Sequence, residues 1–96
     1  MSIKMNEKQI EILDILTEEL AEVIMAISKI KRFGIESEHP VTHVKNIDNF
    51  EEELGDTLCL IDLCIANGLV DNSNIWNYAY TKREKLTKWS KTLMKE

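Results

Sequence analysis

Residues 6–34 read NEKQIEILDILTEELAEVIMAISKIKRFG, and this stretch decides the fold class of the chain. Its apolar side chains recur at spacings of three and four residues, as in an amphipathic helix: Leu13, Leu16, Leu20, Val23, Ile24, Ile27 and Ile30. Asn6 and Gln9 form the pattern of a capping box at the start, and Gly34 is a residue type that ends helices. The stretch therefore predicts one long helix.

The next part of the chain predicts a loop and a second helix. Residues 35–47 contain Pro40 and lack helical periodicity, so we expect a loop there. A second helix is expected to begin at Asp48, with Glu51 placed to complete its cap. It continues to residues 67–68, Asn-Gly, which are typical of a helix end.

The last part of the chain predicts a third helix, which begins near residues 71–74 and carries apolar positions as far as Leu93. No stretch alternates as a strand does, so residues 1–96 predict a single all-α domain of three main helices. A domain of 96 residues buries only a modest share of its surface. Trp76 and Tyr80 need more cover than one small core provides. We therefore expect oligomerisation to complete the helical bundle, with a dimer as the minimum.

Composition excludes several classes of protein. The formal net charge is -5 and no block of Lys or Arg stands out, which argues against a nucleic-acid partner. No apolar run approaches the roughly 20 residues of a membrane-spanning helix, and the first residues lack the apolar core of a signal peptide. We therefore expect a cytoplasmic protein. Cys59 and Cys64 point in different directions on one helix and are interpreted as small buried hydrophobic residues.

Four acidic residues fall at the border of the predicted core. Glu19 and Glu22 share one face of the first helix, and Glu18 lies beyond Glu22 in a more exposed position. Glu53 and Asp56 emerge from a face of the second helix that is otherwise apolar. Uncompensated carboxylates in such a setting cost several kcal/mol or become protonated. Salt bridges and solvent are the ordinary answers, and a hard divalent cation such as Mg²⁺ is the alternative.

The third helix carries a cation among apolar residues. Its seam consists of Ile75, Ala79, Lys82, Leu86, Trp89 and Leu93. The stem of Lys82 can extend outward to solvent, or its ammonium group can meet the acidic cluster or a bound phosphate. Arg83 and Lys85 flank it and add positive charge. Acids for a metal ion and a lysine for phosphate are typical of a site for phosphoryl chemistry.

Two acidic motifs give the chain a family resemblance. Residues 18–22, EELAE, have the form EExxE, and residues 53–56, ELGD, have the form ExxD. In this order on successive helices, they resemble the signature of the MazG-like all-α nucleoside triphosphate pyrophosphohydrolases. Three longer stretches are also similar to small single-domain members: ELAEVIMAISKIKRFG (19–34), LGDTLCLID (54–62) and KREKLTKWS (82–90). The resemblance covers nearly all of the chain except residues 35–47, a longer gap than in many members.

The resemblance implies a helical bundle in dimers or tetramers, with Mg²⁺ at the acidic cluster and Mn²⁺ able to replace it. By motif position it implies these metal ligands: Glu19, Glu22, Glu53 and Asp56. Glu18 would be a further ligand or a neighbouring acid, and Lys82 and Lys85 would bind phosphate. The implied reaction is attack of a metal-activated water on the α-phosphorus of a nucleoside triphosphate, with pyrophosphate leaving. One of the glutamates would take the proton of the water.

Other readings of the residues stay open. The chain can be a catalytically silent helical module that binds a nucleotide or another partner. A carboxylate-bridged di-iron bundle would need Glu-x-x-His pairs, and neither acidic helix carries a histidine. His39 and His43 are separated by Pro40, so they do not form a helical zinc pair. The loop can also close over a base, with one of the aromatic residues stacked on it, although packing is their commoner role: Trp76, Tyr78 and Tyr80.

Overall fold

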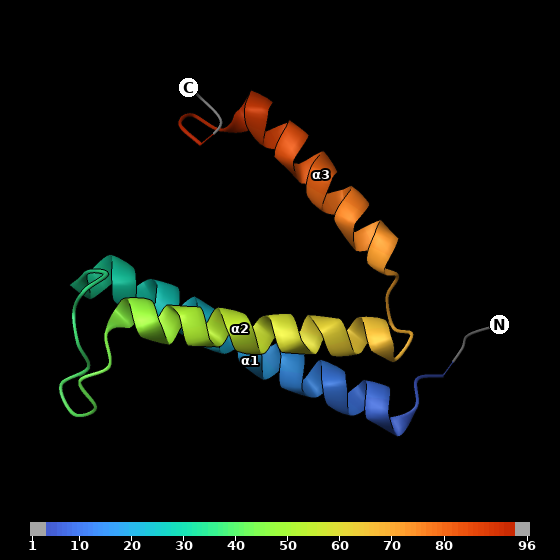
Figure 1. Ribbon diagram of the computed structural model, residues 1–96, viewed down its shortest axis with the longest axis horizontal. Helices are drawn as coiled ribbons and strands as arrows, with labels where there is room; N and C mark the ends of the chain where they lie inside the picture. Colours follow the sequence, from blue (N-terminus) through green and yellow to red (C-terminus); the bar gives the residue numbers. More distant parts are fainter. Residues whose placement is uncertain (1–3, 94–96) are drawn as a thin grey trace.

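A computed structural model describes residues 4–93 of the protein. These residues form three helices (Figure 1). They are α1 (Glu7–Phe33), α2 (Asn46–Ala66) and α3 (Asn72–Trp89). Within the described part of the chain the only β-type pairing is an isolated bridge between Glu38 and Lys45. The all-α fold class is therefore confirmed. None of the described helices combines the length and the apolarity needed to cross a bilayer.

Both ends of α1 follow local rules. The Asn6 side chain accepts a hydrogen bond from the Gln9 backbone N–H at 2.8 Å, and the Gln9 side chain accepts one from the Asn6 N–H at 3.0 Å. This is the predicted capping box. Gly34 has φ 102° and ends the helix, as predicted, and its N–H donates to the Ile30 carbonyl. The Gln9 side chain also donates to the Asn67 carbonyl at 2.7 Å, which ties the start of α1 to the end of α2.

The start of α2 differs from the prediction. The helix begins at Asn46 rather than at Asp48, and its N-cap residue, Lys45, makes no side-chain capping bond. The connection between α1 and α2 is therefore residues 34–45, with Gly34 as the predicted helix end, and the predicted loop at 35–47 extended two residues too far.

A buried amide explains this early start. Asn46 is 8% exposed, and its side-chain N–H₂ donates to the Gly34 carbonyl at 2.9 Å and to the Lys29 carbonyl at 3.4 Å. Its backbone N–H donates to the Ser37 carbonyl at 2.8 Å. These bonds tie the first residue of α2 to the last turn of α1, to its C-cap residue and to the loop that follows. Contacts between the two helices, and not a local cap, thus fix the first residue of α2.

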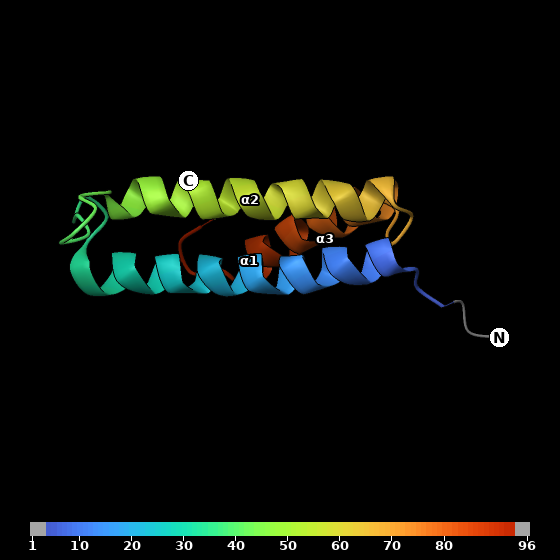
Figure 2. The same ribbon diagram turned by 90° about the horizontal axis from the view of Figure 1, so that it is seen from below.

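Helices α1 and α2 pack side by side as an antiparallel hairpin (Figures 1 and 2). The core is small and consists of Ile12, Leu60 and Cys64, with partly buried apolar residues around it. Only part of the predicted apolar stripe of α1 is buried, because α2 covers the face that carries Ile12 and Ala26. Three residues of the stripe stay exposed: Leu20, Ile24 and Ile27.

The two cysteines have different surroundings. Cys64 is buried in the core, as predicted, whereas Cys59 is exposed, so the prediction of a buried Cys59 was wrong. Both are free thiols, in line with the expectation that they do not pair. Cys59 lies on the face of α2 that turns away from the core because it is one residue removed from the buried Leu60.

Helix α3 stands apart from the hairpin (Figure 1). The Asp71 side chain caps it by accepting a hydrogen bond from the Asn74 N–H, within the predicted start. It ends at Trp89, so the predicted helical seam does not continue to Leu93. No residue of α3 is buried. The radius of gyration is 16.9 Å, whereas a compact domain of this length has roughly 12 Å.

We expect Asn46→Ala to lower the free energy of unfolding by about 1–2 kcal/mol, because it removes a buried amide that bonds to the Gly34 and Lys29 carbonyls. Urea denaturation followed by circular dichroism measures this change. Asn77→Ala is the matched control, because Asn77 is exposed on α3. Equal stability of the Asn46 variant and the control would show that these hydrogen bonds do not hold the hairpin end.

Candidate metal centre

Two glutamates lie in the seam between α1 and α2. Residues seven apart in a helix lie within about 20° of the same direction. The positions seven residues before and after each glutamate are all buried: Ile12 and Ala26 around Glu19, and Asn46 and Leu60 around Glu53. Glu19 and Glu53 are themselves half-buried. The hairpin thus holds two carboxylates in line with residues that are closed off from water.

A third carboxylate joins them from the next turn of α2. One side-chain oxygen from each of Glu19, Glu53 and Asp56 lies within 4.8 Å of the other two. Oxygen ligands stand 2.0–2.1 Å from Mg²⁺, so ligand atoms of one ion are at most roughly 4 Å apart. Small side-chain rotations close that difference. The three carboxylates, from two helices, therefore fit a single hard divalent cation.

The negative charges in this cluster oppose one another. Partial burial and then the charge of Asp56 raise the pKa of Glu19, with further contributions from Glu22 and Glu18. Partial burial and then the charge of Glu22 raise the pKa of Glu53, and Asp56 and Glu19 add to it. Glu19 and Glu53 thus favour protonation more than they would alone in water. A bound cation would reverse this preference.

Among the described residues, no basic side chain forms an ion pair with the cluster. Across residues 4–93 the only ion pair joins Lys45 to Glu36 in the loop, at 3.1 Å and exposed on both sides. Within residues 4–93, salt bridges therefore do not balance the charges of Glu19, Glu53 and Asp56. The donor set is made only of carboxylate oxygens, which suits Mg²⁺ or Mn²⁺ better than softer metals.

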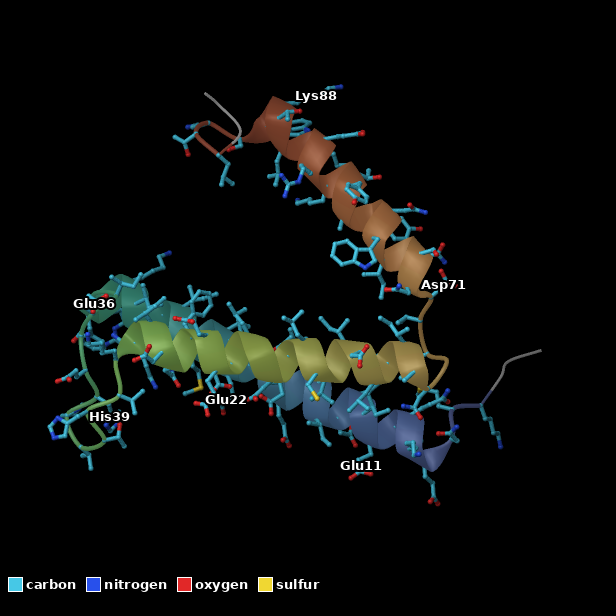
Figure 3. All side chains as sticks on the ribbon, in the orientation of Figure 1. Glu11, Glu22, Glu36, His39, Asp71 and Lys88 are labelled. Atoms are coloured by element: carbon cyan, nitrogen blue, oxygen red, sulfur yellow. The ribbon has the colours of Figure 1, made fainter. Side chains whose placement is uncertain are left out.

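The remaining predicted acids lie around the cluster. Glu22 is exposed one turn after Glu19, and its charge acts on both Glu19 and Glu53. Figure 3 shows its side chain on the side of the hairpin that faces away from α3. Glu18 is exposed as well and acts on Glu19 alone. The structure thus groups three of the predicted acids and leaves Glu22 and Glu18 at the edge.

The predicted phosphate-binding lysines, Lys82 and Lys85, are on α3. The residues of α2 that face α3 line a groove with Trp76 and its neighbours: Leu58, Ile61, Asp62 and Ile65. Ile65 follows Asp56 by nine residues, which is about half a turn around the helix. The acidic cluster and α3 are therefore on opposite sides of the hairpin, and within one chain the two lysines do not meet the acids.

Sequence reasoning missed a hollow at the closed end of the hairpin. It has a volume of about 290 Å³ and is lined by Lys29, Phe33, Ser37, Glu38, His39, Pro40 and Asn46. Of these, only the loop residues His39 and Pro40 drew attention in the sequence. The signal that could have found the others is a spacing of seven residues, from Glu22 to Lys29 and from Asn46 to Glu53.

The raised pKa values predict how stability changes with pH when no metal is present. Glu19 and Glu53 bind protons more readily in the folded chain, so their contribution to stability falls as pH rises above the ordinary value of 4.5 and through the raised values. In EDTA at about pH 7 we expect Glu53→Gln to raise the Tm by a few degrees, and this gain should shrink towards about pH 5.

Added Mg²⁺ should make the Tm of the native protein higher than that of Glu53→Gln, because Mg²⁺ stabilises only a chain that binds it. Thermal unfolding with EDTA and with Mg²⁺ measures both effects, and Glu51→Gln, an exposed glutamate of the same helix, is the control. If Mg²⁺ raised the Tm of the native protein and of Glu53→Gln equally, Glu53 would not be a ligand.

One comparison with known proteins identifies the family of the chain. The family model described as the MazG nucleotide pyrophosphohydrolase domain matches residues 7–88, which include all three helices except the last residue of α3. No curated protein matches the chain, and no solved structure does. The match spans both acidic motifs and far more than half of the sequence. The chain therefore belongs to the MazG nucleotide pyrophosphohydrolase domain family.

Proposed function

We propose that this protein hydrolyses nucleoside triphosphates to nucleoside monophosphates and pyrophosphate, with Mg²⁺ as its cofactor and Mn²⁺ as a substitute. The observation that carries the proposal is the cluster of Glu19, Glu53 and Asp56. Three carboxylates held in a helix seam without a cationic partner suit a metal ion that also accepts phosphate oxygens. Membership of the family adds support from the whole chain.

In this proposal the acidic residues of the hairpin have two roles, metal binding and proton transfer. Glu19, Glu53 and Asp56 hold the ion, and Glu22 beside them is the fourth acid of the ligand set. When bound, Mg²⁺ neutralises charge on the phosphates and makes a water more acidic. Glu18 and Glu22 are exposed at the edge of the cluster, where a carboxylate can take the proton of the attacking water. The water attacks the α-phosphorus, and pyrophosphate leaves.

We also propose that a second copy of the chain completes the site. The phosphates of the substrate need positive charge, yet Lys82 and Lys85 are on the far side of their own hairpin. A homodimer, or a homotetramer built from dimers, would bring α3 of one copy over the acids of the other. The exposed apolar stripe of Leu20, Ile24 and Ile27 gives such an assembly a surface to bury.

The substrate and the thiols favour a cytoplasmic location. Nucleoside triphosphates are available in the cytoplasm, and the exposed free thiol of Cys59 suits a reducing compartment. The net charge of -5 disfavours a nucleic-acid partner.

Pyrophosphate release from a panel of standard and modified ribo- and deoxyribonucleoside triphosphates tests the reaction. We expect release with Mg²⁺, none with EDTA, and nucleoside monophosphate as the other product. Glu53→Gln should lower kcat/KM by at least about 100-fold, because it removes a charged ligand. Glu51→Gln should leave activity unchanged.

No turnover of any triphosphate by the folded native protein in Mg²⁺ would contradict the proposal and favour a silent nucleotide-binding or interaction module. Full activity of Glu53→Gln would instead remove Glu53 from the ligand set.

Mixing two inactive variants tests whether a second copy of the chain completes the site. In a dimer of Glu53→Gln with Lys82→Ala, one site has native acids from one copy and a native Lys82 from the other. Random mixing should therefore restore about one quarter of the native activity, since half of the dimers are mixed and each has one intact site. If Lys82 serves its own chain, the mixture stays inactive. The mass in solution should be a multiple of 11.1 kDa.

A further inference from the structure

The hollow at the closed end of the hairpin is built from three segments. Helix α1 contributes Lys29 and Phe33, the loop contributes residues 37–40, and α2 contributes Asn46. Its volume of about 290 Å³ is at the lower end of the roughly 300–1,000 Å³ found for small-molecule pockets. It therefore suits one part of a nucleotide rather than a whole nucleoside triphosphate.

The hollow opens on the same side of the hairpin as the acidic cluster. Lys29 follows Glu22 by seven residues, and Asn46 precedes Glu53 by seven. Seven residues are two helical turns, so each pair shares a face and is separated by roughly 10 Å along the helix. Figure 3 shows Glu22 and, at the loop, His39 both on the side away from α3. This separation is comparable to the reach of one nucleotide from its 5′ phosphate to the far edge of its base.

The polar groups of the hollow are set by hydrogen bonds within the protein. The His39 Nδ1 accepts the backbone N–H groups of Val41 at 3.1 Å and Thr42 at 3.2 Å. A neutral imidazole bonded in this way carries its proton on Nε2, which is then a donor. The Asn46 amide nitrogen donates to the Gly34 carbonyl, so its oxygen remains as an acceptor. The edge of a nucleobase offers partners for both.

An aromatic ring completes the hollow. Phe33 lies at the end of α1 next to a polar loop, and it is 61% exposed. The Arg32 guanidinium group lies over the ring, 5.0 Å from its centroid. This contact uses part of the ring surface, and Phe33 also lines the hollow, where the ring can meet a planar ligand. Stacking on an aromatic ring is a common way for proteins to hold bases of any identity.

We propose that this hollow binds the nucleobase of the triphosphate whose phosphates lie at the acidic cluster. The inference rests on the proposed function and adds the part of the site that selects the substrate. Phe33 supplies the stacking surface. The His39 Nε2 donor and the Asn46 oxygen acceptor form hydrogen bonds with the edge of the base. The loop residues 37–40, which line the hollow, thus belong to the substrate site, and changes at His39 alter base preference rather than the chemical step.

Steady-state kinetics with purine and pyrimidine triphosphates test this assignment on the full chain. Phe33→Leu keeps apolar volume but removes the ring, and we expect KM to rise about 10-fold with kcat nearly unchanged. Phe33→Tyr keeps the ring and should restore the native KM. His39→Asn keeps an acceptor for the loop N–H groups but removes the Nε2 donor, so it should change the ratio of kcat/KM between bases about 10-fold.

Val41→Ala is the matched control, because Val41 lies in the same loop, is 78% exposed and does not line the hollow. Circular dichroism and the Mg²⁺-dependent rise in Tm should be native in every variant, since none touches the acidic cluster. Native KM values and an unchanged ranking of bases in both Phe33→Leu and His39→Asn would overturn the base site while leaving the reaction intact. Absence of turnover by the native protein would overturn the proposed function itself.

Discussion

The packing of α1 against α2 is the interaction on which the rest of the structure depends, because it forces carboxylates into a seam that is otherwise closed. Glu19 and Glu53 occupy positions in line with buried residues on both sides, and Asp56 adds its charge from the next turn. Their mutual repulsion and partial burial oppose folding. A cation at this point would bridge the two helices, so that under the proposed function it would both stabilise the hairpin and supply charge for the reaction.

The same hairpin explains why one chain is incomplete. Its core is limited to a few residues, and much of the apolar surface of α1 lies outside it. Helix α3 leaves at an angle and carries its cations away from the acids (Figures 1 and 2). Under the proposed function, a single copy therefore carries the metal-binding acids and the phosphate-binding lysines on two opposite sides. The proposed assembly of two copies answers both needs at once, since it covers apolar surface and joins acids to lysines.

The features that local chemistry controls could be predicted from the sequence. The capping box at Asn6, the end of α1 at Gly34 and the start of α3 near Asp71 depend on neighbouring residues alone. The grouping of Glu19, Glu53 and Asp56 was predictable because helical spacing fixes faces and the two motifs belong to a known family. The start of α2 was not, because Asn46 is held by the carbonyls of Lys29 and Gly34, at the end of α1. Periodicity also does not say which neighbour covers an apolar stripe, so the exposure of Leu20 was missed.

The most direct test of a metal ion in the seam is paramagnetic broadening by Mn²⁺ in the NMR spectrum of the native protein. The account predicts that backbone amide signals around Glu19 and Glu53 broaden first, together, at substoichiometric Mn²⁺, and that excess Mg²⁺ restores them. Broadening spread over exposed acids elsewhere, such as Glu7 or Glu84, with no preference for the seam, would contradict it.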